Sequence, residues 1–169
     1  HITEEHLNQL RAKKILRQYH ERRNAEFLLE GFVNNPDYPL FLLCGNAGVG
    51  KTVLLAEMAK QWSAHGEIVL FFPVRGNFGG DLAKDIAVRL GGSPGWQHAR
   101  TVSQQNRQRW IIILDGAENS SDPQRFFREV LAFADEYRDS IKLIVSLRFL
   151  HYRRWKQYLQ PEQHLAGRN

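Results

Sequence analysis

The fold of this chain is decided by the stretch Gly45-Asn46-Ala47-Gly48-Val49-Gly50-Lys51-Thr52. It follows the apolar run of residues 40–44, which is typical of a buried strand, and it precedes a segment with apolar residues at helical spacing. The spacing Gly-x-x-x-x-Gly-Lys-Thr between a strand and a helix is the Walker A phosphate-binding loop. Its glycines allow a tight turn in which backbone N–H groups point inward at phosphate oxygens. The segment therefore predicts a site for a nucleoside triphosphate.

Two side chains of this loop have expected roles of their own. We expect the Lys51 ammonium to reach the β- and γ-phosphate oxygens, and the Thr52 hydroxyl to bind Mg²⁺. The backbone of the loop supplies the remaining contacts to the phosphates. The predicted nucleotide contacts in this segment are Gly45, Asn46, Ala47, Gly48, Val49, Gly50, Lys51, Thr52 and Val53.

Size and composition indicate a soluble globular domain. With 169 residues, 43% hydrophobic and 24% charged, the chain is long enough to bury a core. No apolar run approaches the roughly 20 residues that cross a bilayer, and no signal peptide is recognisable, so we expect no membrane association. The single cysteine, Cys44, lies in the first predicted strand and has no partner for an internal disulfide, which favours the cytoplasm.

The net charge of +5 is unevenly distributed. From residue 148 onward Glu162 is outnumbered by Arg148, Arg153, Arg154, Lys156 and Arg168. Such a tail can bind nucleic acid, but a solvated helix face or a link to a further domain is the favoured interpretation. Because the sequence starts at His1 rather than methionine, we expect neighbouring domains outside it.

The remaining chain alternates between predicted strands and helices. Residues 1–35 form an N-terminal helical segment with two amphipathic helices, 36–150 form the core, and 151–169 form a basic helix or linker. Strands are predicted at 40–44, 68–72, 110–114 and 141–145, with helices beginning after the N-caps Asp81 and Asp122 and a loop at 91–109. This rhythm predicts a three-layer α/β fold, a parallel sheet with helices on both faces and the nucleotide at the carboxyl ends of the strands.

A second acidic strand completes the expected phosphate site. Asp115 ends a run of buried aliphatic residues, where a carboxylate is costly unless it meets a cation, so we interpret it as the Walker B ligand of Mg²⁺. Glu118 is the candidate residue that orients the attacking water. The alternative is that it is only a glutamate in a surface turn. Ser146 and Arg148 end the fourth strand and are candidates to sense the γ-phosphate, although Arg148 can equally form a surface ion pair.

The order of the motifs predicts the topology of the sheet. The Walker B strand is third along the chain, which predicts an additional strand between the two motif strands in space, with the fourth strand beside the first. The guanine-recognition sequence Asn-Lys-x-Asp is absent. The expected cofactors are therefore ATP or ADP with Mg²⁺.

Four segments resemble the signal-transducing STAND ATPases of the NACHT and NB-ARC type. Residues 23–33 resemble the Gly-Arg-Glu-x-Glu segment before the family's Walker A strand, and the family's arginine falls on Arg23. Residues 71–75 are similar to its second strand, 114–119 to its Asp-Gly-x-Asp-Glu Walker B, and 144–148 to its Thr-Ser-Arg sensor. The resemblance covers about residues 19–150 and departs from the family at Asn119 and at Leu147.

The resemblance implies a nucleotide-dependent switch in innate immunity or defence. Such a protein is ADP-bound at rest, forms homo-oligomers with ATP, hydrolyses ATP slowly with Mg²⁺, and carries effector and sensor domains elsewhere. A competing interpretation is an AAA+-like ATPase that handles DNA or RNA, with Tyr152, Trp155 and Tyr158 in the basic tail as a binding surface. The third, least favoured, is a small-molecule kinase with a phosphate-covering lid in residues 92–109.

Overall fold

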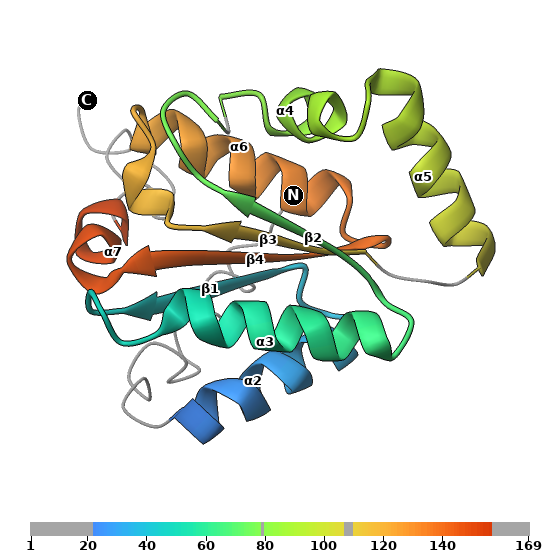
Figure 1. The fold of residues 1–169 in the computed structure, drawn as a ribbon. Helices are drawn as coiled ribbons and strands as arrows, with labels where there is room; N and C mark the ends of the chain where they lie inside the picture. The colour runs from blue at the N-terminus through green and yellow to red at the C-terminus, as the bar shows by residue number, and fades with distance from the viewer. Residues whose placement is uncertain (1–21, 79, 107–109, 157–169) are drawn as a thin grey trace, which may run out of the picture.

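The strands of this protein form one parallel sheet. A computed structural model describes residues 22–78, 80–106 and 110–156. The sheet has the spatial order β1-β4-β3-β2 (Figure 1). Its strands are β1 (Leu40–Gly45), β2 (Ile68–Pro73), β3 (Trp110–Asp115) and β4 (Ile141–Arg148). Because β4 lies between the Walker A strand β1 and the Walker B strand β3, the predicted additional strand is confirmed.

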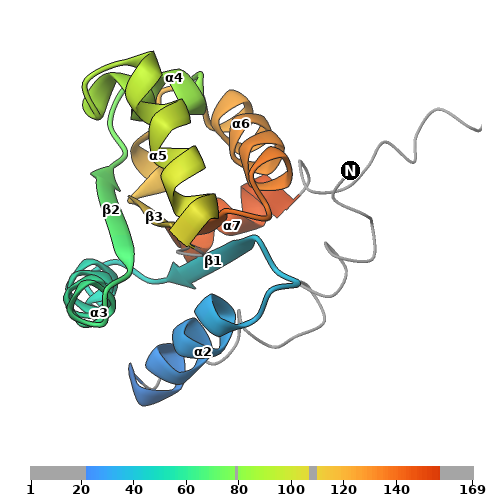
Figure 2. The same cartoon turned by 90° about the vertical axis from the view of Figure 1, so that its right-hand side faces the viewer.

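Helices cover both faces of the sheet, as the alternating pattern predicted. Figures 1 and 2 show α2 and α3 on one face and α4, α5 and α6 on the other. A short helix, α7, follows β4 at the carboxyl ends of the strands. The helices are α2 (Arg22–Asn34), α3 (Lys51–Ala64), α4 (Leu82–Arg89), α5 (Ser93–Asn106), the 3-10 turn η1 (Ala117–Asn119), α6 (Pro123–Glu136) and α7 (Phe149–Trp155). The three-layer α/β fold is therefore confirmed.

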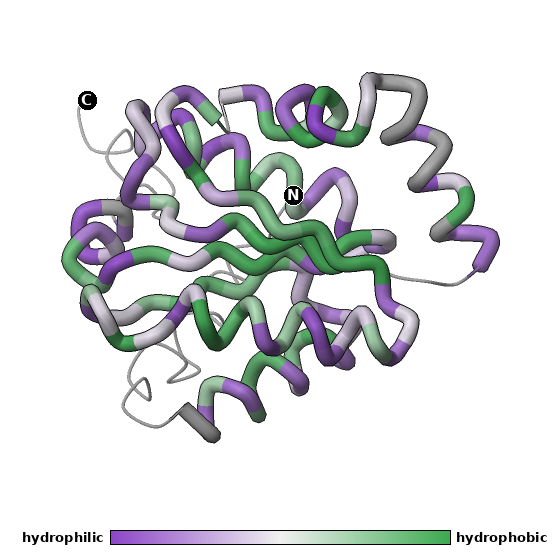
Figure 3. The backbone as a smooth tube through the Cα atoms, in the orientation of Figure 1, coloured by the Kyte–Doolittle hydropathy of each residue, from purple (hydrophilic) through white to green (hydrophobic). Residues whose placement is uncertain are grey.

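The apolar strands supply the core on both sides of the sheet. Successive side chains of a strand point to opposite faces, so a strand covered on both faces is apolar throughout. Ile111, Ile113 and Ile144 pack with α2 and α3, while Ile112 and Val145 pack with α4 and α6. Figure 3 shows the sheet as the most hydrophobic part of the backbone.

Two helix starts follow the chemistry that their sequences predicted. The Asp81 carboxylate accepts a hydrogen bond from the Lys84 backbone N–H at 3.1 Å, and α4 begins at the next residue. In the same way Asp122 accepts from the Arg125 N–H at 3.0 Å before α6. Each cap satisfies a backbone donor that the first helical turn leaves without a partner.

The prediction of a loop at residues 91–109 is wrong. Helix α5 occupies most of this segment. Its sequence contains few apolar residues, because α5 packs mainly against α4 at the periphery, so the periodic signal of a core helix is missing. Figure 1 places α5 near the amino ends of the strands, far from the phosphate loop, so α5 does not form the lid that the kinase interpretation required.

Some expectations concern residues outside these elements. The first of the two N-terminal helices falls on residues 1–21, outside the described residues. In the described part of the chain, no helix combines the length and apolar character needed to cross a bilayer.

A buried lysine ties the segment before β1 to the centre of the sheet. Lys142, at the start of β4, is 1% exposed, and its ammonium donates hydrogen bonds to the backbone carbonyls of Asn35 and Tyr38. The same ammonium lies 4.9 Å from the centre of the Phe32 ring, a cation–π distance. This side chain thereby holds the end of α2 against β4.

We predict that Lys142→Met destabilises the fold by about 2–3 kcal/mol, because Met keeps the apolar stem but leaves two carbonyls without their donor. The measurement is urea unfolding of both variants followed by circular dichroism. Lys60→Met is the matched control, since Lys60 is exposed on α3. Equal midpoints for the two variants would contradict the assignment.

Candidate functional site

The phosphate loop connects the end of β1 to the first turn of α3. Gly48 and Gly50 have φ angles of 76° and 83°, in the left-handed region that residues with a side chain rarely adopt. Residues 46–50 are exposed, so the amino end of α3 faces solvent. Unpaired backbone N–H groups and the helix dipole make such an end a site for anions. The loop has the geometry that the Walker A sequence predicted.

Lys51 lies across its own loop. Its ammonium donates hydrogen bonds to the carbonyls of Gly45 and Asn46, each at 2.9 Å. Burial lowers the pKa of this ammonium; nearby Glu118 counteracts the shift, while the charge of Arg148 adds to it. A lysine held in this place can exchange its carbonyl partners for phosphate oxygens without leaving the loop.

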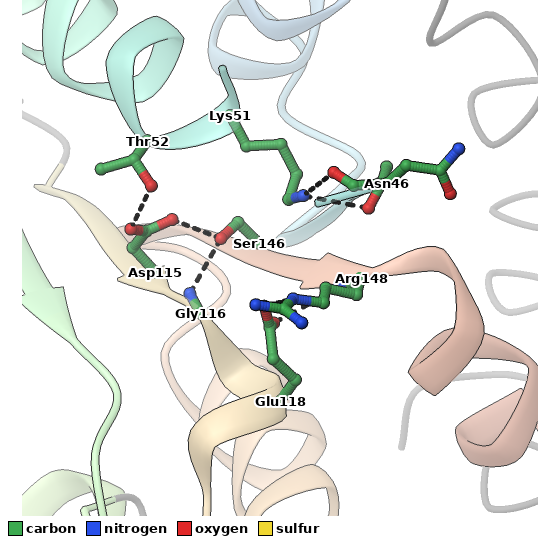
Figure 4. A network of polar contacts seen from close by, with 9 residues as sticks. Asn46, Lys51, Thr52, Asp115, Gly116, Glu118, Ser146 and Arg148 are labelled. Carbon is green, nitrogen blue, oxygen red and sulfur yellow. Dashed lines mark hydrogen bonds and ion pairs between the residues drawn. The ribbon is translucent and has the colours of Figure 1, made fainter. Parts of the chain in front are cut away.

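The structure brings the Walker A and Walker B residues into direct contact (Figure 4). The Thr52 hydroxyl donates to one carboxylate oxygen of Asp115 at 2.8 Å. The other carboxylate oxygen accepts from the hydroxyl of Ser146, which in turn accepts from the Gly116 backbone N–H at 2.9 Å. Three consecutive hydrogen bonds thus join α3, β3 and β4 at the carboxyl edge of the sheet.

The donor atoms at this edge fit a magnesium ion held together with nucleotide. Thr52 and Asp115 offer a hydroxyl and a carboxylate, the hard oxygen ligands that Mg²⁺ prefers. Among the described residues, no group of three or more His, Cys, Asp or Glu side chains gathers to hold a metal by itself. Mg²⁺ is usually held by one or two carboxylates together with substrate phosphates and water.

Glu118 and Arg148 form an ion pair next to this cluster. The Arg148 Nε donates to one Glu118 oxygen at 3.0 Å, and the Arg148 backbone N–H donates to the other at 3.2 Å. The side chain of Glu118 is 11% exposed and that of Arg148 is 53% exposed. Arg148 therefore forms the ion pair that was one of its two expected roles. It also lies beside the candidate phosphate site, and its role as a γ-phosphate sensor stays a prediction.

The remaining candidates are less closely connected. Arg23 belongs to α2, but its side chain lies outside the description. Val49, in the loop, and Val53, in the first turn of α3, leave 47% and 54% of their surface exposed, so a ligand can reach them. Ser146, expected near the γ-phosphate, is fully buried and contacts Asp115 instead.

Tyr152 does not belong to a binding surface. It is 7% exposed and belongs to the hydrophobic core that α6 also lines. The expectation that it forms part of a surface for nucleic acid is therefore wrong. The helical periodicity of α7 turns Tyr152 inward and leaves Arg153 and Arg154 exposed. Of the other two aromatic residues, the Trp155 side chain and all of Tyr158 lie outside the described residues.

Sequence reasoning missed one residue of the site, Gly116. Its φ of 77° is left-handed, and a β-carbon there would lie 2.7 Å from the Asn119 side-chain nitrogen. This conformation turns its N–H toward the Ser146 hydroxyl. The available signal was a glycine directly after the acidic residue that ends the strand.

Comparison with solved structures identifies the fold class. No model of a protein family and no curated protein matches the sequence. The ORC1 protein of Aeropyrum pernix, solved in complex with DNA, is similar with a TM-score of 0.53 and 18% identity over 89% of this chain and 45% of that chain. Drosophila ORC bound to DNA gives a TM-score of 0.51 at 13% identity, over 84% of this chain and 42% of that one. Cdc6p from Pyrobaculum aerophilum gives a TM-score of 0.51 at 18% identity, over 83% of this chain and 42% of that chain.

These similarities are similarities of fold. The chain has the α/β architecture of P-loop ATPase domains as seen in the ORC1 and Cdc6 structures, and it spans less than half of the length of those chains. The comparisons support the P-loop ATPase fold, and they do not show the STAND type that the sequence resembles.

We predict that Lys51→Ala abolishes nucleotide binding, because residues 45–52 contain no second cation that could bind the phosphates in place of this ammonium. The measurement is isothermal titration calorimetry with Mg²⁺ and ATP or ADP. Lys60→Ala, on the same helix but exposed and away from the loop, should bind like the wild type. Wild-type affinity in Lys51→Ala would contradict the site.

Proposed function

We propose that this chain is an ATP- and ADP-binding NTPase module with slow, Mg²⁺-dependent hydrolysis. The observation that carries the proposal is the hydrogen bond between Thr52 and Asp115, residues 63 positions apart in the sequence. Nothing in a simple strand-to-helix turn requires this contact. A site that holds Mg²⁺ beside the β- and γ-phosphates needs the hydroxyl of the loop and the carboxylate of the acidic strand close together.

Each residue of the site has a part in this proposal. Backbone N–H groups of residues 46–50 and the Lys51 ammonium bind the phosphates. Thr52 and Asp115 hold Mg²⁺, which neutralises charge on the phosphate oxygens when it is bound. Val49 and Val53 offer exposed apolar surface on which an adenine base can pack.

The ion pair of Glu118 with Arg148 supports slow hydrolysis. A carboxylate that orients the attacking water must direct one of its oxygens at that water. Here both oxygens accept hydrogen bonds from Arg148. We propose that the γ-phosphate competes for the Arg148 guanidinium and thereby frees Glu118, so that turnover depends on a rearrangement of this pair.

We predict that Glu118→Gln retains nucleotide binding and lowers the hydrolysis rate about 10²-fold, the smaller end of what a positioned base contributes. Phosphate release and calorimetry measure the two effects separately. Glu67→Gln is the control, because Glu67 lies before β2 at the opposite edge of the sheet. Turnover equal to that of the control would remove Glu118 from the mechanism.

A DNA-handling ATPase is the more specific function that the comparisons favour over a signalling switch. Two of the similar structures contain DNA. In this chain, Arg153, Arg154 and Lys156 are exposed on or directly after α7, next to the candidate nucleotide site. Exposed Lys and Arg side chains can neutralise the phosphates of a nucleic-acid backbone. The interpretation as a signalling switch, which implies an ATP-dependent homo-oligomer, is supported by the sequence resemblance alone.

We predict that the chain binds single-stranded DNA with an affinity that falls as salt rises. Combined Arg153→Ala and Arg154→Ala replacement should reduce the slope of log affinity against log salt by about 1 to 1.5, since each lost phosphate contact accounts for about 0.7. Fluorescence anisotropy measures this slope, with Lys60→Ala as the control. ATP-dependent oligomerisation without DNA binding would favour the switch instead.

A further inference from the structure

Ser146 is a fully buried polar residue at the centre of the site. It lies near the end of β4, and none of its surface is exposed. Its register partner on β1 is Leu43, while its hydroxyl reaches across to Asp115 and Gly116 at the end of β3. A buried hydroxyl of this kind is costly unless its hydrogen bonds are made. Here both of these hydrogen bonds join Ser146 to the Walker B segment.

The chemistry of the partners fixes the direction of each hydrogen bond. A backbone N–H only donates, so the Ser146 oxygen accepts from Gly116. An ionised carboxylate only accepts, so the single proton of the Ser146 hydroxyl is donated to Asp115. The hydroxyl therefore has no proton left for a phosphate oxygen.

The other carboxylate oxygen of Asp115 orients Thr52. It accepts the proton of the Thr52 hydroxyl at 2.8 Å, so the lone pairs of Thr52 point away from the carboxylate. Lone pairs are what a hydroxyl offers to a cation. Ser146 thus holds one oxygen of the same carboxylate whose other oxygen orients the Thr52 hydroxyl.

We infer that Ser146 is a positioning residue that sets the affinity of the site for Mg²⁺ by orienting Asp115, and that it makes no contact with the γ-phosphate. This inference rests on the proposed nucleotide site and assigns a role within it. Contact with the phosphate falls to Arg148, two positions further along β4 and 53% exposed at its side chain. One strand thus supplies a buried group for the carboxylate and an accessible group for the ligand.

The test separates binding of Mg²⁺ from binding of nucleotide. For wild type and Ser146→Ala, calorimetry measures the ADP affinity in EDTA, and then the Mg²⁺ concentration that gives half of the full gain in affinity. We expect the affinity in EDTA to change less than about 2-fold in the variant. We expect the required Mg²⁺ concentration to rise about 10-fold or more, the usual effect of removing a group that orients a metal ligand.

Further variants control for packing and for independent effects. Ser146→Cys keeps nearly the same volume with a weaker donor, and it should shift the Mg²⁺ requirement in the same direction if Ser146→Ala does not fold. In an Asp115→Asn background, Ser146→Ala should add no further shift, because the two residues act through one ligand. A purely structural role would move the unfolding midpoint without this dependence on Asp115.

Two results would overturn the inference. One is an unchanged Mg²⁺ requirement in a folded Ser146 variant. The other is a loss of ATP affinity relative to ADP in EDTA, which would show direct contact with the γ-phosphate. If the wild type itself bound no nucleotide, the proposed function would fail instead, so the two failures are distinguishable.

Discussion

The hydrogen bond between Thr52 and Asp115 is the contact on which the candidate site depends. Thr52 belongs to the first turn of α3 and Asp115 to the end of β3, and β4 separates β3 from the strand that leads into α3. The contact is possible because the parallel register brings the carboxyl ends of three strands to one edge. The strand order of the sheet therefore determines which residues meet at the candidate phosphate site.

The charged groups around this contact already compensate one another. Two cations, Lys51 and Arg148, stand beside two carboxylates, Asp115 and Glu118, and each has a hydrogen-bond partner within the protein. A half-buried charge without such a partner would be costly. In the proposed function, nucleotide and its metal ion would replace some of these partners. The lowered pKa of Lys51 reflects burial that the neighbouring carboxylate only partly offsets.

The sequence allowed the central features of the fold and the site to be predicted, and the exceptions have physical reasons. Strands covered on both faces are apolar throughout, and the glycines and Lys51 have strict spacing, so both are recognisable. Helix α5 was missed because it packs at the periphery with a polar sequence. The partners of Ser146 and Arg148 were missed because a hydroxyl or a guanidinium has many possible acceptors, and only the register of β4 selects among them.

Strand β4 also links the pairing of the sheet to the geometry of the candidate site. Lys142 and Ser146 lie four residues apart on the same face, with Ile144 between them in the core beneath α2 and α3. A slip of β4 by one residue would turn all three to the opposite face. Such a misfolded chain would lose the anchor of α2 and the support of Asp115 in the same event. An error in the pairing of β4 would thus disrupt the fold and the candidate site together.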